Sequence, residues 1–366
     1  MNPIRLGVIG GGVNSAVGYA HFCASRLDNK FQFVAGVFSR NSTVNLMSGA
    51  KYGINESRIY NSVNDFLICE KDSIDAVLIL TPTPSHYQLI EELKILGKPV
   101  ICEKSVTANL EEANNLKSHF SNSNLYVIYN YTGYPMVREI KQIIAAGLLG
   151  SLISVNVEMP QSGFIKRNKG GGVNPIQDWR SHDGEICTLS LDLGVHVHSL
   201  IKFTCGLEPT SVFAQANHKG NYGNIIDSIH ALVAFDSDII GNIWYGKTAL
   251  GNLNGLKIRI YGTMGSAEWC QNNPDVLMLA NGRGSVTNID MGNVNLLEAN
   301  KGSYNRFKPG HATGFIESLA NYYYSIASSF DGKPDSFILN LDDAIMGIEF
   351  VSAIEQSFKS SAKITL

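Results

Sequence analysis

Asp192 and His196 are the residues whose types and spacing first suggest chemistry. They lie four positions apart in a segment predicted to be helical, 190–203, so both side chains would share one helical face. On such a face a carboxylate can orient an imidazole and raise its basicity, as a general base requires. A capping aspartate beside a packed histidine fits the same spacing. His198 would face elsewhere on a helix, and a His-x-His metal site would need a strand.

Polar residues also follow two buried apolar runs, 76–80 and 100–102. If these runs are strands of a parallel sheet, their carboxyl ends face the crevice in which such sheets bind ligands. Lys104 would then project toward a bound ligand, although a solvent-exposed lysine after a buried strand is the simpler interpretation of its position alone. The residues that we expect to line the crevice at these two strand ends are Thr81, Pro82, His86, Glu103 and Lys104.

A glycine triplet at 10–12 follows the first apolar run. Dinucleotide sites use such a turn because the first glycine permits a tight bend, the second lets backbone approach the pyrophosphate, and the next helix offers free N–H groups. Ser15 stands where the fingerprint has its third glycine, and Gly18 lies one turn further on. Glycine triplets also occur in ordinary turns, so the position after a first strand is what favours a dinucleotide site. The expected cofactor contacts here are Gly10, Gly12, Asn14 and Ser15.

The second predicted strand, 31–38, bears on which dinucleotide binds. NAD sites place an acidic residue at the end of this strand to hold the ribose hydroxyls. Here the strand is followed by Ser39 and Arg40, a small hydroxyl and a cation that suit a 2′-phosphate. The pair slightly favours NADP over NAD, although Arg40 could instead stack on adenine or lie in solvent.

The first third of the chain alternates short apolar runs with helical patterns. We expect strands at 5–9, 31–38, 76–80, 100–102 and 125–129, and helices at 15–27, 86–96 and 110–120. Such alternation indicates an α/β domain with a doubly wound parallel sheet.

After Tyr131 the pattern changes, and a helix over 135–146 opens a second domain. Alternating segments separated by turn residues then predict a mostly antiparallel sheet. Its expected strands are 151–158, 210–216, 229–235, 239–245 and 256–261, with closing helices at 314–330 and 341–358. The prediction is a dinucleotide-binding domain, 1–132, and an α+β domain for substrate binding and oligomerisation, 133–366, whose late helices can pack back on the first.

The composition excludes several kinds of partner. Hydrophobic residues make up 44% of the chain and charged residues 17%, which is typical of a globular protein. A net charge of -3 without a dense basic run gives no footprint for nucleic acid. We see no signal peptide or membrane-spanning run and expect a cytoplasmic protein that does not bind membranes. The sequence contains no cluster of metal-binding residue types, so we expect no metal site.

Five segments occur in an order that carries a family likeness. They are GVIGGG at 7–12, TPTPSH at 81–86, ICEKS at 101–105, DLGVH at 192–196 and YGTMGSAEW at 261–269, followed by GHATGFIESLAN at 310–321. Together they resemble the glucose-fructose oxidoreductase/inositol dehydrogenase family, usually called Gfo/Idh/MocA. The resemblance implies an N-terminal Rossmann domain and an NAD(P)-dependent oxidoreductase.

The resemblance also implies site residues. The family's Glu-Lys-Pro motif falls on 103–105 and its Asp-x-Gly-x-His motif on 192–196, which makes Lys104, Asp192 and His196 the catalytic candidates. Ser105 replaces the family's proline, and serine rarely supports a cis peptide bond. For oxidation of a secondary alcohol, we hypothesise that His196 is the base, Asp192 fixes its tautomer and Lys104 donates to the reacting oxygen. Lys104 could instead be the base.

Because these residues come from both predicted domains, we expect the site in the cleft between them. Tyr131, Trp179 and Arg180, and also His311, are candidates for substrate contacts, although each fits packing or surface equally well. The resemblance points to a sugar, an inositol or a sugar nucleotide. Alternatives are an NAD-dependent glycosidase that oxidises its substrate transiently, and a non-catalytic regulator that senses dinucleotide or sugar. By analogy we expect a homo-oligomer, dimer or tetramer.

Overall fold

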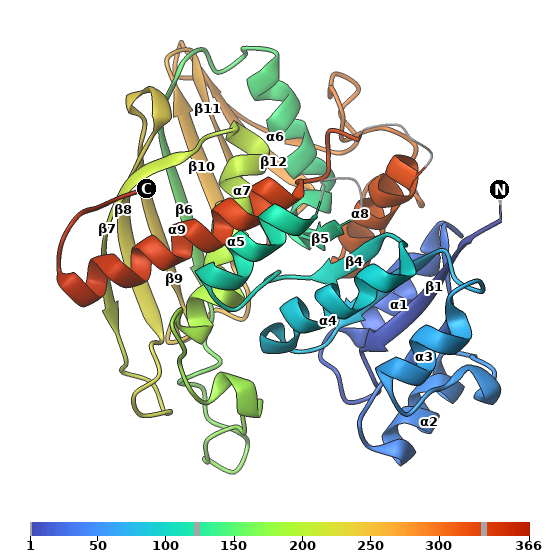
Figure 1. Ribbon diagram of the computed structural model, residues 1–366. Helices are drawn as coiled ribbons and strands as arrows, with labels where there is room; N and C mark the ends of the chain where they lie inside the picture. Colours follow the sequence, from blue (N-terminus) through green and yellow to red (C-terminus); the bar gives the residue numbers. More distant parts are fainter. Residues whose placement is uncertain (1, 121–124, 331–334) are drawn as a thin grey trace. The chain divides into compact units, whose positions relative to one another are not determined.

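The chain contributes alternately to two compact units. The computed structural model describes residues 2–120, 125–330 and 335–366 (Figure 1). The first unit comprises Met1–Thr107, Glu111–Gly133 and Gly314–Ile345. The second comprises Ala108–Leu110, Tyr134–Thr313 and Met346–Leu366. The chain therefore returns to the first unit after it has formed most of the second.

The first unit is built on a five-stranded sheet in which every pairing is parallel, with the order β2-β1-β3-β4-β5. Its strands are β1 (Ile4–Gly10), β2 (Phe31–Val37), β3 (Ala76–Leu80), β4 (Val100–Glu103) and β5 (Leu125–Ile128). All five residues of β3 are buried, because helices cover both faces of such a sheet. The predicted doubly wound parallel sheet is confirmed.

The helices of this unit differ from the prediction in two respects. They are α1 (Gly18–Leu27), α2 (Ser42–Lys51), α3 (Val63–Glu70), α4 (His86–Leu93), α5 (Leu110–His119) and α8 (Phe315–Phe330). The helix predicted from residue 15 begins at Gly18, and α2 and α3 were not expected. Helix α8 belongs to this unit: Tyr322 Oη donates to the Val127 carbonyl at 2.8 Å and Asn321 Nδ2 to the Gly133 carbonyl at 2.9 Å.

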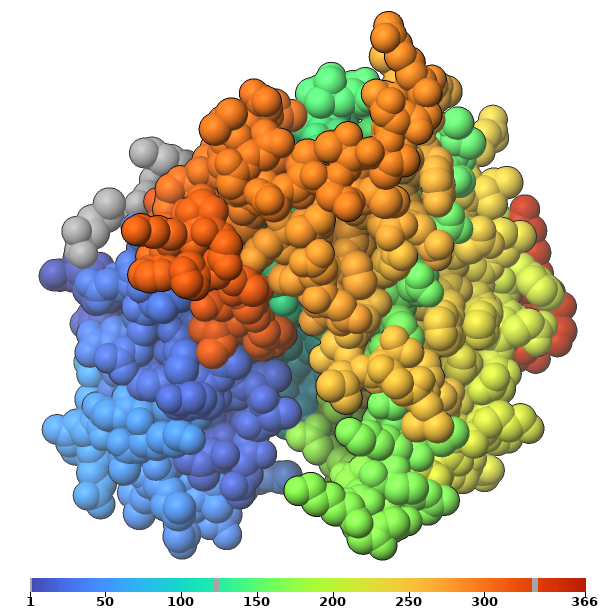
Figure 2. All heavy atoms as spheres, turned by 180° about the vertical axis from the view of Figure 1, so that it is seen from behind, coloured from blue at the N-terminus to red at the C-terminus, as the bar shows by residue number. Residues whose placement is uncertain are grey.

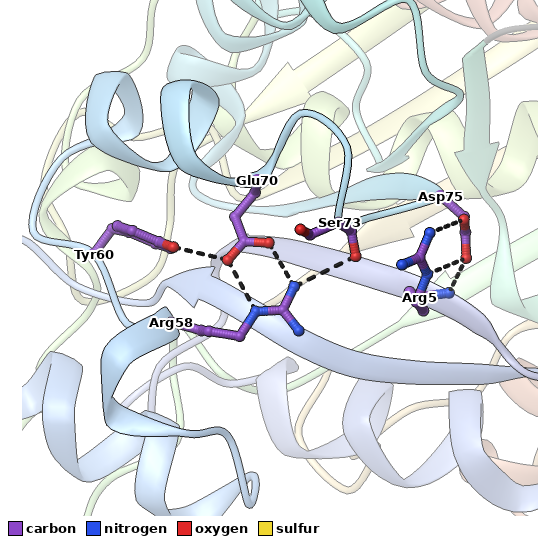
Figure 3. A network of polar contacts seen from close by, with 6 residues as sticks. All are labelled: Arg5, Arg58, Tyr60, Glu70, Ser73 and Asp75. Atoms are coloured by element: carbon purple, nitrogen blue, oxygen red, sulfur yellow. Dashed lines mark hydrogen bonds and ion pairs between the residues drawn. The ribbon is translucent and has the colours of Figure 1, made fainter.

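A polar network fixes the irregular segment between α2 and α3 (Figure 3). The buried Glu70 carboxylate accepts hydrogen bonds from Arg58 Nε at 2.9 Å and from Tyr60 Oη at 2.8 Å. Nearby, Arg5 on β1 pairs with Asp75 just before β3, at 2.8 Å, and holds the pKa of that carboxyl below its usual range. These contacts are structural and lie among residues that no prediction assigned to a site.

The second unit contains a nine-stranded sheet with the order β13-β12-β11-β10-β6-β9-β8-β7-β14. The strands are β6 (Leu152–Pro160), β7 (Pro209–Asn217), β8 (Ser228–Phe235), β9 (Ile240–Gly246), β10 (Lys257–Gly262), β11 (Gly265–Cys270), β12 (Val276–Asn281), β13 (Val286–Asp290) and β14 (Ile364–Thr365). Among the strands of this sheet in the described part of the chain, only β6 and β9 pair in parallel. The prediction of a mostly antiparallel sheet is confirmed, but β11 to β14 were missed.

Helices α6 (Pro135–Ala145), α7 (Val195–Cys205) and α9 (Leu341–Ser360) accompany this sheet, and α9 is divided between the units after Ile345. We call the face that carries Tyr245 the inner face, because Tyr245 Oη lies 2.8 Å from Ser190 Oγ just before α7. The opposite, outer face has a shallow hollow of about 350 Å³, where the rings of His230 and Trp244 stack. Across the described ranges, no helix has the length and apolar character needed to cross a bilayer.

Candidate functional site

The glycine turn ends β1 in a backbone that other residues rarely adopt. Gly10 and Gly11 have φ angles of 84° and 69°, in the left-handed region. At Gly12 a Cβ would lie 2.9 Å from the carbonyl oxygen of Phe38, at the end of β2. The turn therefore leaves bare backbone at the carboxyl ends of two neighbouring strands, as the approach of a pyrophosphate requires.

Gly18 supplies the close packing that the sequence assigned to the position of Ser15. A Cβ on Gly18 would lie 2.0 Å from the Gly11 carbonyl oxygen, so α1 can begin against the glycine turn only with glycine there. Ser15 Oγ instead accepts hydrogen bonds from the N–H groups of Val17 and Gly18, at 3.3 and 3.1 Å. Gly18 therefore takes the role of the third glycine of the fingerprint, three residues later in the chain than the fingerprint places it. These residues fit a bound dinucleotide.

The predicted ribose contacts lie beside this turn. Ser39 Oγ accepts a hydrogen bond from the Asn41 N–H at 3.1 Å, and Asn41 caps the first turn of α2. Arg40 is exposed. Its guanidinium is therefore within reach of solvent at the carboxyl end of β2.

His86 joins the ends of β3 and β4. Its Nδ1 lies 2.6 Å from the Ser105 carbonyl oxygen and its Nε2 lies 2.7 Å from that of Thr81. The ring is fully buried, and this burial lowers the pKa of His86. Thr81 is half-buried and Pro82 exposed, so of the three predicted residues here His86 is the one whose side chain holds the two strand ends together.

Glu103 fixes the backbone next to Lys104. Its carboxylate accepts the Lys104 N–H at 3.1 Å and lies 3.0 Å from Nε2 of His21, whose Nδ1 lies 2.8 Å from Tyr323 Oη on α8. The Lys104–Ser105 peptide bond is cis. Serine therefore occupies a geometry that we expected to be rare for it, and replacement of the family's proline leaves that geometry in place.

Asp192 lies in a single π-helical turn, Ser190–Gly194, and α7 begins only at Val195. The prediction of one α-helix over 190–203 is therefore wrong at its start, and the face-sharing argument from 3.6 residues per turn does not describe this turn. A Cβ on Gly194 would lie 2.9 Å from Val351 Cγ1 and 3.0 Å from Tyr245 Oη. Close packing explains the glycine of the motif, and π-helical turns are frequent at functional sites.

Two cations bind the Asp192 carboxylate. Arg180 Nη2 donates to Oδ1 at 3.1 Å, and Lys247 Nζ forms an ion pair with Oδ2. Lys247 is 5% exposed and lies directly after β9, with its Nζ 4.9 Å from the centre of the Phe164 ring. Both oxygens of the carboxylate are therefore bound by cationic side chains. Sequence reasoning selected Arg180 and Asp192 but missed Lys247, although its position just past a predicted strand was a usable signal.

The two histidines of α7 are both buried. His196 lies in the first turn of the helix and is 6% exposed. His198 packs against Phe350, with ring centres 5.6 Å apart, and burial lowers its pKa to about 3. Within the described ranges, no three potential metal-binding side chains of His, Cys, Asp or Glu gather at one point.

The predicted substrate residues are distributed over both units. Trp179 is half-buried and lies under the Arg180 guanidinium at 4.8 Å, so these two residues lie with Asp192. They follow the exposed segment 166–173, which Figure 2 shows in light green. Tyr131 is buried in the 3-10 turn Asn130–Gly133 of the first unit. His311 is exposed, its ring 4.6 Å from that of Phe307.

Comparison with known proteins agrees with this arrangement. Residues 4–131 match the family model described as oxidoreductase family, NAD-binding Rossmann fold, and residues 137–268 match the GFO/IDH/MocA C-terminal domain. The uncharacterized oxidoreductase YfiI of Bacillus subtilis is 26% identical over 98% of this chain and 95% of its own length.

Two solved structures are similar over the whole chain. An oxidoreductase from Sinorhizobium meliloti is 30% identical, with a TM-score of 0.87 and 100% of both chains covered. An inositol dehydrogenase homolog from Azotobacter vinelandii, complexed with NADH and myo-inositol, is 23% identical, with a TM-score of 0.89 over 100% of this chain and 98% of its own. From its two domain matches and these relatives, the chain belongs to the Gfo/Idh/MocA family of oxidoreductases and carries that family's NAD-binding Rossmann domain.

Proposed function

We propose that this enzyme oxidises a secondary alcohol of a sugar, an inositol or a sugar nucleotide. The observation that supports this most directly is the Asp192 carboxylate, which is bound by Arg180 and Lys247 and lies four residues before the buried His196. In this proposal the Asp192 carboxylate orients the His196 imidazole and supports its basicity, as a general base requires. The relative that binds NADH and myo-inositol supports a polyhydroxylated substrate.

The cofactor would be held by the glycine turn and by the end of β2. Gly10 and Gly12 would accommodate the pyrophosphate, with Asn14, Ser15, Thr81, Pro82 and Glu103 as further proposed contacts. Ser39 and the exposed Arg40 would contact the adenine ribose, and the cation favours NADP over NAD. When bound, the dinucleotide supplies the hydride acceptor.

The chain's own residues then divide the proton chemistry among them. His196 takes the proton of the substrate hydroxyl, and Asp192 stabilises the imidazolium that results. Arg180 and Lys247 fix the position of the Asp192 carboxylate. Lys104 donates a hydrogen bond to the substrate oxygen as negative charge develops on it, its backbone held by Glu103.

Variants at the two proposed proton-handling residues test the assignment. In Lys104→Ala and His196→Ala, we expect the rate of NAD(P)⁺ reduction with myo-inositol, D-glucose or D-xylose to fall about 10²–10⁴-fold, the usual contribution of a general acid or base. Lys98→Ala, at the opposite end of β4, and His119→Ala, exposed at the end of α5, are matched controls that should retain activity. Dinucleotide affinity and melting temperature show that each variant is folded. If neither catalytic variant loses more than about tenfold, the assignment is wrong.

Dissociation constants test the cofactor preference. Wild-type protein should bind NADPH more tightly than NADH, and Arg40→Ala should lose about tenfold or more in NADPH affinity because a charge-assisted hydrogen bond is removed. NADH affinity should change little. Tighter binding of NADH by the wild type contradicts the preference without affecting the proposed reaction.

A further inference from the structure

Asp227 lies directly opposite Lys247 in the second sheet. In the β8–β9 pairing Ser228 lies opposite Gly246. The same register continues one residue beyond the strands, where the Lys247 N–H donates to the Asp227 carbonyl at 2.8 Å. Side chains opposite each other in an antiparallel pair point to the same face. Lys247 lies two residues after Tyr245, so both it and Asp227 belong to the inner face. Lys247 forms the ion pair with Asp192 on this side.

The carboxyl group of Asp227 is only half satisfied. The residue is 2% exposed, and its Oδ2 accepts a hydrogen bond from the Gly220 N–H. Oδ1 is buried too, and no hydrogen-bond donor in the described part of the chain reaches it. Burial raises the pKa of Asp227, whereas the backbone N–H groups of Gly220 and Lys219 and the nearby side chains of His218 and Lys219 lower it. A buried acceptor left open in this way is costly for folding and calls for an explanation.

Other buried or partly buried carboxylates of the second unit show what full satisfaction looks like. Glu139 accepts the N–H groups of Leu297, Glu298 and Ala299 at 2.9, 2.7 and 2.9 Å, so both its oxygens are used. Asp183 accepts the Thr188 N–H on Oδ1 at 2.9 Å and the Ile226 N–H on Oδ2 at 2.8 Å. Asp227 differs because its Oδ1 is left for a donor that none of the described residues provides.

The surroundings of Asp227 suit a carbohydrate. Gly220, which binds Oδ2, lies against the backbone of Phe164, since a Cβ there would be 2.8 Å from the Phe164 carbonyl oxygen. The Phe164 ring lies beneath Lys247 Nζ. A buried aromatic ring, a buried ammonium group and an open carboxylate oxygen are therefore gathered in one part of the inner face. The hydroxyl and C–H groups of a sugar or cyclitol present the complementary set.

We propose that Asp227 determines substrate specificity by accepting, at Oδ1, a hydrogen bond from a substrate hydroxyl other than the one that is oxidised. The inference rests on the proposed function for the class of substrate. It adds that the site requires at least two hydroxyl groups, because a simple secondary alcohol would leave Oδ1 buried and unpaired. A substrate carboxylate at this position would be repelled.

The variant Asp227→Asn tests this with little change of shape. Its amide oxygen can still accept the Gly220 N–H, while the amide nitrogen puts a donor where Oδ1 offered an acceptor. The substrates are myo-inositol, D-glucose and D-xylose, and whichever has the highest kcat/KM is compared with its monodeoxy analogues. Wild-type enzyme should reject one analogue by roughly 10²-fold or more. In Asp227→Asn, KM for the full substrate should rise about tenfold to hundredfold, and the discrimination against that analogue should fall to about threefold or less.

Thermal stability separates recognition from a structural role. Asp227→Asn should melt no lower than wild type at neutral pH, because it removes a buried charge that lacks a full set of donors. Glu139→Gln is the matched control, which should melt lower and discriminate against the deoxy analogue as wild type does. A lower melting temperature for Asp227→Asn with unchanged discrimination overturns the inference and leaves the proposed function intact. If the wild type neither oxidises nor, by calorimetry, binds any of the three substrates, the proposed function fails and the inference fails with it.

Discussion

His198 is a histidine that folding keeps neutral. Its imidazole is buried against Phe350, and a Cβ on Gly347 would lie 3.1 Å from its Nδ1, so α9 closes over the ring. The pKa of about 3 lies below the ordinary value of 6.5 because burial disfavours the charged form. Between these two values the unfolded chain binds a proton that the folded chain does not. The folded protein therefore has its full free energy of unfolding only at pH values above the ordinary pKa of histidine.

The free energy of unfolding should consequently fall as the pH is lowered through this window. Well below the ordinary pKa of His198 each pH unit should cost about 1.4 kcal/mol, and the loss between about pH 6.5 and about pH 4.5 should be about 2 kcal/mol. In His198→Leu this part of the loss should disappear, which urea titrations at the two pH values can measure. Carboxylates titrate alike in both proteins and cancel from the comparison. Equal losses in the two proteins would mean that His198 is protonated in the folded state.

The sequence predicted the residues of the site better than their contacts. Asp192 and His196 stand in a recognisable motif, and Arg180 is near them in the chain. Lys247 is 55 positions from its partner Asp192, and their ion pair depends on which strand lies behind the π-helical turn. Asp227 could not be selected from the sequence for the same reason. Its proposed role rests on the open Oδ1 and on the β8–β9 register, and neither is visible in the local sequence pattern.

At the level of elements, the approach of α1 to the glycine turn leaves no room for a side chain. In Gly18→Ala the new Cβ would collide with the backbone of Gly11, which cannot give way as a flexible side chain can. We expect a loss of about 1–3 kcal/mol in stability, as for other overpacked sites, together with weaker dinucleotide binding. The measurements are the free energy of unfolding and the dissociation constant for NADPH.

Gly302→Ala is the control for that substitution, because a Cβ at Gly302 has no atom within 4 Å and its φ is not positive. It should match the wild type in both measurements. A Gly18→Ala protein with wild-type stability and affinity would show that α1 can shift without disturbing the turn.

The elements that the sequence predicted well are those with a strong apolar pattern. Strand β3 was placed at both ends because its five residues are all apolar and buried. Helix α2 was not predicted because Asn45, Ser48 and Gly49 supply its buried face, so its sequence has little apolar periodicity. Strand β13 was not predicted because four of its five residues are exposed, so it lacks an alternating apolar pattern. The start of α1 was misplaced because Ser15, three residues earlier, resembles a helical position but caps the turn instead.

At the level of the whole molecule, the first unit depends on a helix that the chain supplies late. Residues 1–133 include its entire parallel sheet, but α8 provides hydrogen bonds to Val127 and Gly133, and Tyr323 contacts His21. Without α8 those groups lose their partners and apolar surface is exposed. We expect a fragment of residues 1–133 to lack a cooperative thermal transition by circular dichroism.

Restoring the helix should restore the transition. A Cβ on Gly133 would lie 1.9 Å from the Ser318 carbonyl oxygen, so a short linker can join residues 1–133 to residues 314–345. This fused chain should melt cooperatively and bind dinucleotide. Cooperative melting of 1–133 alone, at the same temperature as the fused chain, would show that α8 is dispensable for the unit.

The late position of α8 also has a consequence during translation. A ribosome must add the whole of residues 134–313 after the last strand of the parallel sheet before the helix that completes this unit emerges. While most of the second unit is synthesised, the nascent dinucleotide domain therefore lacks helix α8, which is part of its finished structure. Premature termination between residue 134 and the end of α8 would release a polypeptide that contains every residue of the glycine turn but has no finished domain in which to hold it.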